Sequence, residues 1–349
     1  MQLLPCAAGC PGHSSGERTC MPDTMLETVA DAVVFSRHPS EWSTNWGESL
    51  LMYGLAAAAN RFPHERYLAY IRAWMEHHLR QGVRVTHYCG TWGPVLVIPT
   101  LFRMYGDDRY LALGERICEF IMHEAIRWPD GAIQHSDRHA WLFVDTVYYC
   151  APELVRMGAL LDRPAYFDEA VRQVELHTAH LFDPAAALYL HAEEAGTGRR
   201  TSGFWGRGNG WMAMSCIELL EWLPKSHPGR PRITALFQQH CRALLRVQDT
   251  RGLWHTVLER PDTYLETSCS AMFAYCFARG LALGLLERAY MDAARRTWRA
   301  LQDKVDERGN VVGVSAGTGP GDVAHYNSIP TGTYPWGTGA FLLAATQME

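Results

Sequence analysis

The chain has 349 residues, of which 48% are hydrophobic and 20% are charged, so it has enough apolar side chains for a large folded core. Its formal net charge is -5, which gives no basic surface for nucleic acid, and we expect no nucleic-acid partner. No apolar run approaches the roughly 18 residues that a membrane helix needs, so we expect no membrane partner.

The first residues, 1–21, are predicted to form a flexible leader, because they lack the apolar core of a secretion signal. The leader contains Cys6, Cys10, His13 and Cys20 at a spacing that matches no strong zinc motif, and we expect no metal and no cofactor. Six later cysteines lie in apolar helical stretches and are expected to be buried thiols in a reducing compartment, which predicts a cytoplasmic protein: Cys118, Cys150, Cys216, Cys241, Cys269 and Cys276.

From residue 22 onward, apolar and amphipathic helical segments alternate along the chain. Four amphipathic helices open on a tyrosine after a short turn, at Tyr67, Tyr110, Tyr166 and Tyr290, and each follows a more apolar helix. A repeat of about 50 residues is typical of stacked helical hairpins. The more apolar helix of each hairpin is expected on the inside.

The first and last helical segments, "MLETVADAVVFSR" and "WGTGAFLLAATQM", are each half of a hairpin. Joining them would close a ring of about six hairpins. We therefore predict an all-α fold, an (α/α)6 barrel, with residues 22–349 in a single domain. An open helical solenoid is the alternative, but it leaves the two half-hairpins unexplained.

The loops that follow outer helices resemble each other: "DGAIQH", "AALYLH", "RGLWHT" and "RGNVVG". In a barrel all such loops emerge at one end, which would bring His135, His191 and His255 to the same rim. A lone histidine is more often structural than catalytic. Three at matching positions of the repeat favour a shared pocket lining.

Asp145 lies in the apolar stretch "WLFVDTVYYCAPEL", where a carboxylate is costly unless it is paired or functional. We predict one inner helix here, with Trp141 four residues earlier on the same face. Apolar neighbours are expected to raise the pKa of Asp145, so that it carries a proton near neutral pH. The alternative is a structural aspartate bonded to a helix end or a tyrosine.

The segment "GFWGRGNGW", residues 203–211, spaces its large side chains with glycine. If the segment is extended, Trp205, Arg207, Asn209 and Trp211 share one face and the glycines the other. That face would offer stacking surfaces, a cation and an amide to an anionic sugar. The alternative is a glycine-rich turn whose tryptophans fill a core.

Several stretches together resemble a known enzyme family: "NWGESLLMYGL", "FVDTVYYCAPEL", "FWGRGNGWMAM", "GLWHTVLERPDTYLETSCSAMFAY", and "GVSAGTGPG" followed by "PWGTGAFLLA". They are similar, in order from about residue 42 to the end, to the unsaturated glucuronyl and rhamnogalacturonyl hydrolases of glycoside hydrolase families 88 and 105, the second more closely. The resemblance implies an (α/α)6 barrel. It also implies an enzyme that acts on oligosaccharides whose end a polysaccharide lyase has converted to a 4,5-unsaturated uronic acid.

The resemblance implies hydration of the C4=C5 bond rather than attack at the anomeric carbon. Asp145 would protonate C4 and then help water attack C5, and the hemiketal would collapse and release the remaining sugar. Arg207 would hold the substrate carboxylate and the tryptophans would stack on the ring. The substrate-binding residues we expect are Trp46, Glu48, Thr91, His135, Trp141, His191, Trp205, Arg207, Asn209 and Trp211.

The chain departs from this family at the start of the second inner helix, where the family usually has a second aspartate. The segment "THYCGTWGPVL" contains no carboxylate, so Thr91 or His87, or Glu48 from the first inner helix, is predicted to take that place. The exact uronic acid and the neighbouring sugar stay open. Two other classes of protein also remain, a polysaccharide lyase on a similar barrel and a non-catalytic carbohydrate-binding relative, as does the choice between monomer and homodimer.

Overall fold

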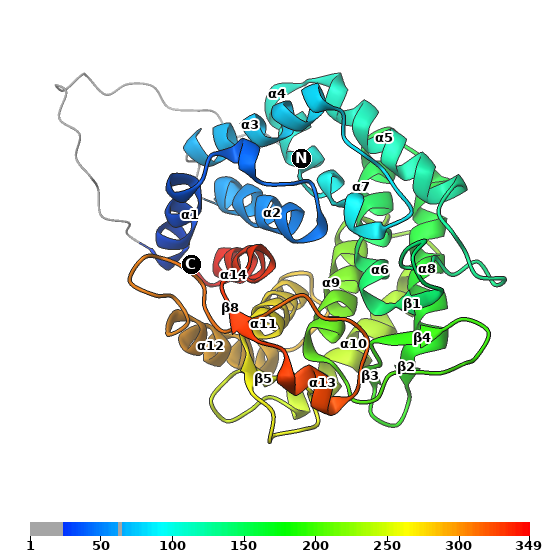
Figure 1. The fold of residues 1–349 in the computed structure, drawn as a ribbon, viewed down its shortest axis with the longest axis vertical. Helices are drawn as coiled ribbons and strands as arrows, with labels where there is room; N and C mark the ends of the chain where they lie inside the picture. The colour runs from blue at the N-terminus through cyan, green and yellow to red at the C-terminus, as the bar shows by residue number, and fades with distance from the viewer. Residues whose placement is uncertain (1–23, 62–64) are drawn as a thin grey trace.

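The computed structural model describes residues 24–61 and 65–349, and the predicted leader with its three cysteines and His13 lies outside this part of the chain. The described helices alternate between an inner and an outer ring (Figure 1). This arrangement confirms the predicted all-α class and the (α/α)6 barrel. None of the described helices is both long and apolar enough to cross a bilayer.

The inner ring is formed by the more apolar helices, as the alternation predicts. Nearly every residue of α9 is buried, because this helix has neighbours on all sides. The inner helices are α2 (Trp46–Arg61), α4 (Ile98–Tyr105), α7 (Ala151–Leu161), α9 (Gly206–Trp222), α11 (Thr267–Ala282) and α14 (Pro335–Met348). Short 3-10 turns lie at Pro39–Glu41, Cys89–Thr91 and Gly93–Val97, the last leading directly into α4.

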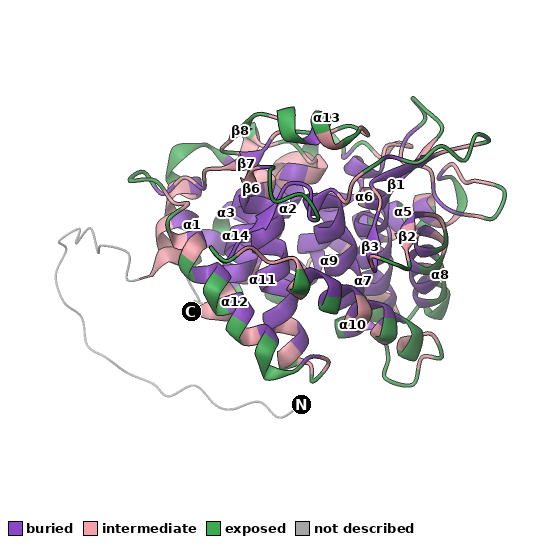
Figure 2. Ribbon diagram, turned by 90° about the horizontal axis from the view of Figure 1, so that it is seen from below, coloured by how far each residue is buried: buried purple, intermediate pink, exposed green. Residues whose placement is uncertain are grey.

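The outer helices are amphipathic, with one buried and one exposed face (Figure 2). The tyrosines at their starts, Tyr67, Tyr110, Tyr166 and Tyr290, are all buried against the inner ring. The outer helices are α1 (Met25–Ser36), α3 (Glu65–Gln81), α5 (Asp108–His123), α8 (Pro164–Leu181), α10 (Arg230–Arg246) and α12 (Arg288–Gln302).

The ring closes where the last inner helix, α14, packs between α11 and α2 (Figure 1). Glycines let the two backbones approach, since a Cβ on Gly339 would lie 2.5 Å from the Leu50 carbonyl oxygen and one on Gly54 2.7 Å from that of Gly339. The Leu26 amide of α1 also donates to the Glu349 side chain over 3.0 Å. The two predicted half-hairpins therefore meet, as closure of the ring requires.

The two ends of the barrel differ in their connections. Turns from inner to outer helices are short, whereas the loops from outer to inner helices are long and carry all the strands. The strands form antiparallel pairs, β1 (Trp141–Phe143) with β4 (Ala192–Glu194), β2 (Phe182–Asp183) with β3 (Leu188–Tyr189), β5 (Trp254–His255) with β6 (Leu265–Glu266), and β7 (Val314–Ser315) with β8 (Thr331–Gly332). A short helix, α13 (Val323–Ser328), covers the same end (Figure 2).

Residues 141–161 do not form the single inner helix that we predicted. Residues 141–143 are strand β1, the five-residue helix α6 (Val144–Tyr148) follows, and α7 starts only at Ala151. Pro152, the second residue of α7, has no backbone N–H and so cannot continue the hydrogen-bond pattern of a helix running on from α6, which separates the two helices. Trp141 therefore does not share a helical face with Asp145.

The segment 203–211 is also not extended, because α9 begins at Gly206. Its glycines serve helix packing. A Cβ on Gly206 would lie 3.0 Å from the His255 carbonyl oxygen, and one on Gly210 would lie 2.5 Å from the Met272 sulfur. Close packing outweighs the low helix propensity of glycine here, so the alternating-face prediction for this segment was wrong.

Candidate active site

A cavity opens among the long loops at one end of the barrel. Asp145 is the single carboxylate among its described lining residues, and Arg207 the single guanidinium. The complete lining is Trp46, Tyr88, Cys89, Gly90, His135, Phe143, Asp145, Tyr149, Trp205, Arg207, Gly317 and Thr318.

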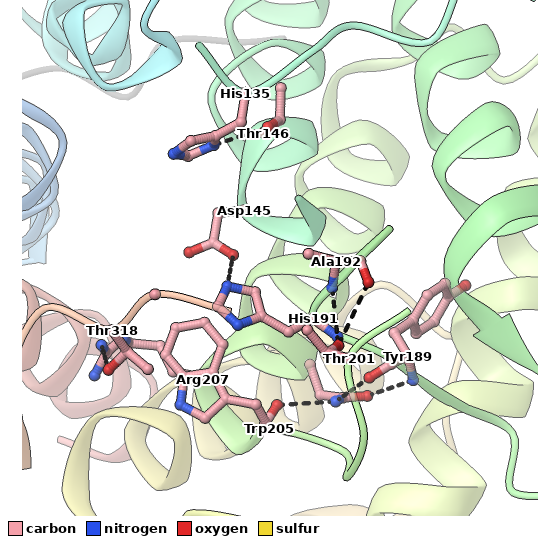
Figure 3. A network of polar contacts seen from close by, with 12 residues as sticks. His135, Asp145, Thr146, Tyr189, His191, Ala192, Thr201, Trp205, Arg207 and Thr318 are labelled. Atoms are coloured by element: carbon pink, nitrogen blue, oxygen red, sulfur yellow. Dashed lines mark hydrogen bonds and ion pairs between the residues drawn. The ribbon is translucent and has the colours of Figure 1, made fainter. Parts of the chain in front are cut away.

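Strand pairing places Asp145 beside His191. Phe143 of β1 lies opposite Ala192 of β4, and the Val144 amide donates to the His191 carbonyl over 2.9 Å. The chain then turns into α6 and directs the Asp145 carboxylate toward the His191 ring, with 3.4 Å between Oδ2 and Nε2 (Figure 3). The side chain of Asp145 keeps 18% of its surface exposed, whereas His191 is buried.

The ring of His191 is fixed from behind. Its Nδ1 lies 3.1 Å from the Tyr326 hydroxyl, and its backbone amide donates to the Thr201 hydroxyl over 3.1 Å. Trp205 packs on the imidazole at 4.3 Å between ring centroids. His191 is therefore a rigid partner for Asp145.

The pKa of Asp145 in the free protein is lowered, whereas we predicted that it would be raised. Burial works to raise this pKa, but the contact with His191 and the electrostatic influence of His191, His135 and Arg207 outweigh burial and lower it. In the free protein Asp145 is thus an ionised carboxylate at neutral pH. The prediction failed because it counted apolar neighbours in the sequence and not the polar groups that the loops bring in.

Arg207 lies in the first turn of α9 and is 1% exposed. Its Nη1 donates to the Ser315 carbonyl over 2.9 Å and also to the Ser315 hydroxyl. Its Nη2 donates to the Ala316 carbonyl over 2.7 Å and to the Thr318 hydroxyl over 3.1 Å. All four Nη hydrogens are therefore used to hold the loop that forms one wall of the cavity.

The positive charge of Arg207 is not neutralised by direct contact. No carboxylate of the described residues lies within ion-pair distance, and its buried Nε–H has no hydrogen-bond partner among them. Glu266, buried at the start of α11, accepts a hydrogen bond from the Ser315 amide over 2.9 Å. It therefore contacts the same loop residue as Arg207 without pairing with the guanidinium. Burial lowers the pKa of Arg207, yet an arginine stays charged in proteins.

The other predicted residues of the 203–211 segment have structural contacts. Asn209 is fully buried; its side chain bonds the backbone of Tyr189 in both directions and also contacts His240. Trp211 is 1% exposed and packs against Tyr148. Neither lines the cavity.

Two tryptophans line the cavity. Trp205 borders it but is 2% exposed, with Tyr326 stacked on its ring at 6.0 Å and the Arg207 guanidinium at 4.6 Å. Trp46 is half-buried and rests on Trp336 at 4.5 Å. Trp46 is thus the tryptophan with surface left for a sugar.

The residues proposed to replace the second aspartate do not line the cavity. Thr91 donates its hydroxyl to the Tyr88 carbonyl over 2.9 Å, and the ring of His87 packs on Phe120 at 5.2 Å. Glu48 sits in the first turn of α2, half-buried. Instead, the wall formed by this segment consists of Tyr88, Cys89 and Gly90.

Two of the three rim histidines belong to the cavity region. His135 lines the cavity, and His191 lies behind Asp145. His255 is buried elsewhere, with Nε2 3.1 Å from an Asp249 carboxylate oxygen. Trp141 in β1 lies outside the cavity beneath the Arg199 guanidinium.

Sequence reasoning missed Tyr88, Cys89, Gly90, Phe143, Tyr149, Gly317 and Thr318 as lining residues. Phe143 is two residues from Asp145, and strand β1 sets its direction. Gly317 and Thr318 belong to "GVSAGTGPG", whose glycine content was a usable signal for close approach to a ligand. No group of three or more His, Cys, Asp or Glu side chains in residues 24–61 and 65–349 is arranged to hold a metal ion.

Comparisons with known proteins identify the family of this chain. Residues 20–349 match the profile of Glycosyl Hydrolase Family 88. The chain is 31% identical over 305 residues to the unsaturated rhamnogalacturonyl hydrolase YesR of Bacillus subtilis, covering 84% of this chain and 85% of the relative. A solved structure from Salmonella enterica, described as a possible member of the GH105 family, is 25% identical with a TM-score of 0.86 and 96% coverage of both chains. A solved polysaccharide lyase, 20% identical over 93% of this chain and 95% of its own, shares the fold with a TM-score of 0.76.

Proposed function

Because the chain belongs to glycosyl hydrolase family 88, we propose that it releases a terminal 4,5-unsaturated uronic acid from lyase-generated oligosaccharides by hydrating the C4=C5 enol ether. The name of the Bacillus subtilis relative, an unsaturated rhamnogalacturonyl hydrolase, supports this substrate class. In this proposal the partner of the cavity is the unsaturated sugar, and Asp145 is the catalytic residue.

The observation that carries the proposal is the single carboxylate in the cavity lining. Glycosidases that attack the anomeric carbon generally need two carboxyl groups, one as acid and one as nucleophile or base. Hydration of an enol ether needs one group that donates a proton and then accepts one from water. Asp145 is suited to both steps in turn, since donating its proton to C4 leaves it ionised beside C5.

The substrate itself supplies the conditions for protonating Asp145. In the free protein the positive surroundings of Asp145 hold its pKa low. A bound uronate would add a negative charge near Arg207 and exclude water, and both changes raise the pKa of a neighbouring carboxyl group. Binding of the anion and uptake of a proton by Asp145 are therefore coupled in this mechanism.

The substrate carboxylate has a favourable place beside the loop that Arg207 holds. The backbone N–H groups of Gly317 and Thr318 make no hydrogen bond among the described residues, and both residues line the cavity. Successive free amides attract anions, and the buried charge of Arg207 lies directly beneath them. Arg207 would thus act through its charge and through the loop, rather than by a two-pronged contact with the substrate.

One absorbance assay tests the proposal. The conjugated enol ether absorbs in the ultraviolet, so absorbance should fall when the protein meets unsaturated disaccharides produced by polysaccharide lyases. Intact polyuronates are assayed in parallel, and there a rise in absorbance would show a lyase instead. Binding without any change in absorbance would support a carbohydrate-binding protein.

A further inference from the structure

At the cavity wall, the side chains of Cys89 and Thr146 meet around one nitrogen of His135. Nδ1 of His135 lies 3.1 Å from the Thr146 hydroxyl and 3.4 Å from the Cys89 sulfur (Figure 3 shows the first contact). The sulfur also lies 4.0 Å from the Thr146 hydroxyl. Cys89 is 1% exposed and Thr146 is fully buried, so water does not compete for these groups.

Counting protons in this cluster selects one tautomer of His135. If Nδ1 is unprotonated, it accepts the Thr146 hydroxyl proton while the Cys89 thiol donates to the hydroxyl oxygen, so every proton has an acceptor. If Nδ1 carries the proton, it and the thiol both point at the hydroxyl oxygen. The Thr146 proton then has no nitrogen or oxygen acceptor among the described residues, which is unfavourable at a buried position.

The titration behaviour of the cluster agrees with this count. Burial lowers the pKa of His135 to about 3, so the ring is neutral at physiological pH and carries one proton. Burial, together with the negative charge of Asp145, raises the pKa of the Cys89 thiol, so the sulfur also keeps its proton. The neutral ring must then carry its proton on Nε2, which has no partner among the described residues and belongs to a side chain that lines the cavity.

We propose that Cys89 and Thr146 are positioning residues that hold His135 as its Nε2–H tautomer, so that this wall of the cavity presents a neutral hydrogen-bond donor to the substrate. The tautomer follows from the cluster alone. Only the contact with the substrate rests on the proposed function.

This assignment gives the two walls of the cavity opposite hydrogen-bonding roles. Asp145 accepts hydrogen bonds in its ionised form, whereas His135 donates one and cannot accept on the cavity side. The sugar must therefore present an acceptor oxygen to His135. A second aspartate in this segment, such as the resemblance to the family implies, would instead accept from sugar hydroxyl groups, so this chain would select its substrate by a different contact.

The first test measures the tautomer directly in the free protein. Histidine labelled with ¹⁵N distinguishes the two ring nitrogens by chemical shift, and the His135→Gln variant assigns the signals. We expect an unprotonated Nδ1 and a protonated Nε2 in the wild type. Cys89→Ser keeps a proton donor and should preserve this pattern, whereas the double variant Cys89→Ala with Thr146→Val removes both donors and should shift the signals toward the other tautomer. The Nδ1–H tautomer in the wild type, or an unchanged spectrum in the double variant, would overturn the assignment.

The second test connects the tautomer to the substrate. Loss of one hydrogen bond corresponds to roughly a two- to tenfold weakening. The double variant should therefore raise KM several-fold or more with a smaller effect on kcat, and Cys89→Ser should stay near the wild type. A protein with the expected spectrum but no activity on unsaturated sugars would refute the proposed function and leave the tautomer assignment intact. Normal KM in the double variant, despite a changed spectrum, would refute the positioning role.

Discussion

Two arginines are buried among the described residues, one near each end of the barrel, and their charges are compensated in opposite ways. Arg156, near the end with short turns, forms an ion pair with Glu218 of α9, and both side chains are at most 1% exposed. Arg207, at the other end of α9, bonds only neutral oxygens of residues 315–318. Helix α9 thus carries in its first turn Arg207, whose charge has no carboxylate partner among the described residues. Near its end, α9 carries Glu218, which neutralises the charge of Arg156.

In the proposed function, this difference separates a structural arginine, Arg156, from one that serves the site, Arg207. Burial works to lower the pKa of Arg156, but the negative charge of Glu218 outweighs it and raises that pKa. Tyr53 donates a further hydrogen bond to Glu218 over 2.9 Å, so little charge remains to attract a ligand. At the other end, the charge of Arg207 remains available to an anion, and the ionised Asp145 there is available for chemistry.

The largest expected effect comes from Asp145→Asn. The amide keeps the shape of the side chain but cannot deliver a proton, so turnover should fall by about 10²- to 10⁴-fold, the usual contribution of a general acid. Steady-state kinetics on an unsaturated disaccharide measure this effect, and circular dichroism checks the fold. Near-normal turnover in a folded variant would remove Asp145 from the mechanism.

At the opposite end, Glu218→Gln should lower stability rather than activity. Breaking a buried ion pair from one side leaves the other charge uncompensated and typically costs about 3–5 kcal/mol. We expect a clearly lower thermal midpoint with kcat/KM close to the wild type at a temperature where the variant is folded. Tyr53→Phe is a milder companion, for which the loss of one hydrogen bond should cost about 1 kcal/mol. A folded Glu218→Gln protein without activity would contradict the division between the two ends.

The charge of Arg207 and the hydrogen bonds that its planar guanidinium makes to the loop can be tested separately. Arg207→Lys keeps the charge but loses most loop contacts, so it should weaken binding of a uronate and of its neutral amide analogue alike and lower the melting temperature. Arg207→Gln also removes the charge, so the preference for the acid over the amide should fall by roughly tenfold. If Arg207→Lys weakened the acid selectively and left the melting temperature unchanged, the guanidinium would instead contact the carboxylate directly.

The dependence of kcat on pH should be the smallest of these effects within the neutral range. The free Asp145 has a lowered pKa and must gain a proton for reaction, so kcat/KM should fall by about tenfold for each pH unit above that pKa. In the complex the pKa is raised, so kcat should stay level to a higher pH before it falls. Parallel profiles of kcat and kcat/KM would show that binding does not change the protonation of Asp145.

The fold could be predicted from the sequence because its signal is local and repeated. Helical periodicity, the buried tyrosines and the two half-hairpins each needed only short stretches of chain. His135 and Asp145 were also predictable, from a repeated loop and from a charge in an apolar run. Wrong predictions arose where long-range contacts decide the outcome. Packing against distant residues made a helix of the glycine-rich segment after residue 205, and pairing of β1 with β4 turned Trp141 out of the predicted helix.

The contacts within the site were beyond local sequence reasoning for the same reason. The loop that holds Thr318 lies over a hundred residues after Arg207, and no pattern in either stretch identifies the other. Likewise, Cys89 of the 3-10 turn Cys89–Thr91 contacts Thr146 of α6, which lies 57 residues later in the chain. The lowered pKa of Asp145 followed from such contacts, so its direction was not accessible from neighbouring residues alone.

The central claim, hydration of the double bond by Asp145, is tested most directly by reaction in D₂O. If Asp145 delivers the proton to C4 from one face, the product should carry deuterium at one of the two C4 positions with a single stereochemistry, as NMR can show. Attack at the anomeric carbon would release an unsaturated sugar that rearranges freely in solution, and deuterium would then appear at both C4 positions. The first result is the one that this account predicts, and equal labelling of the two positions would contradict it.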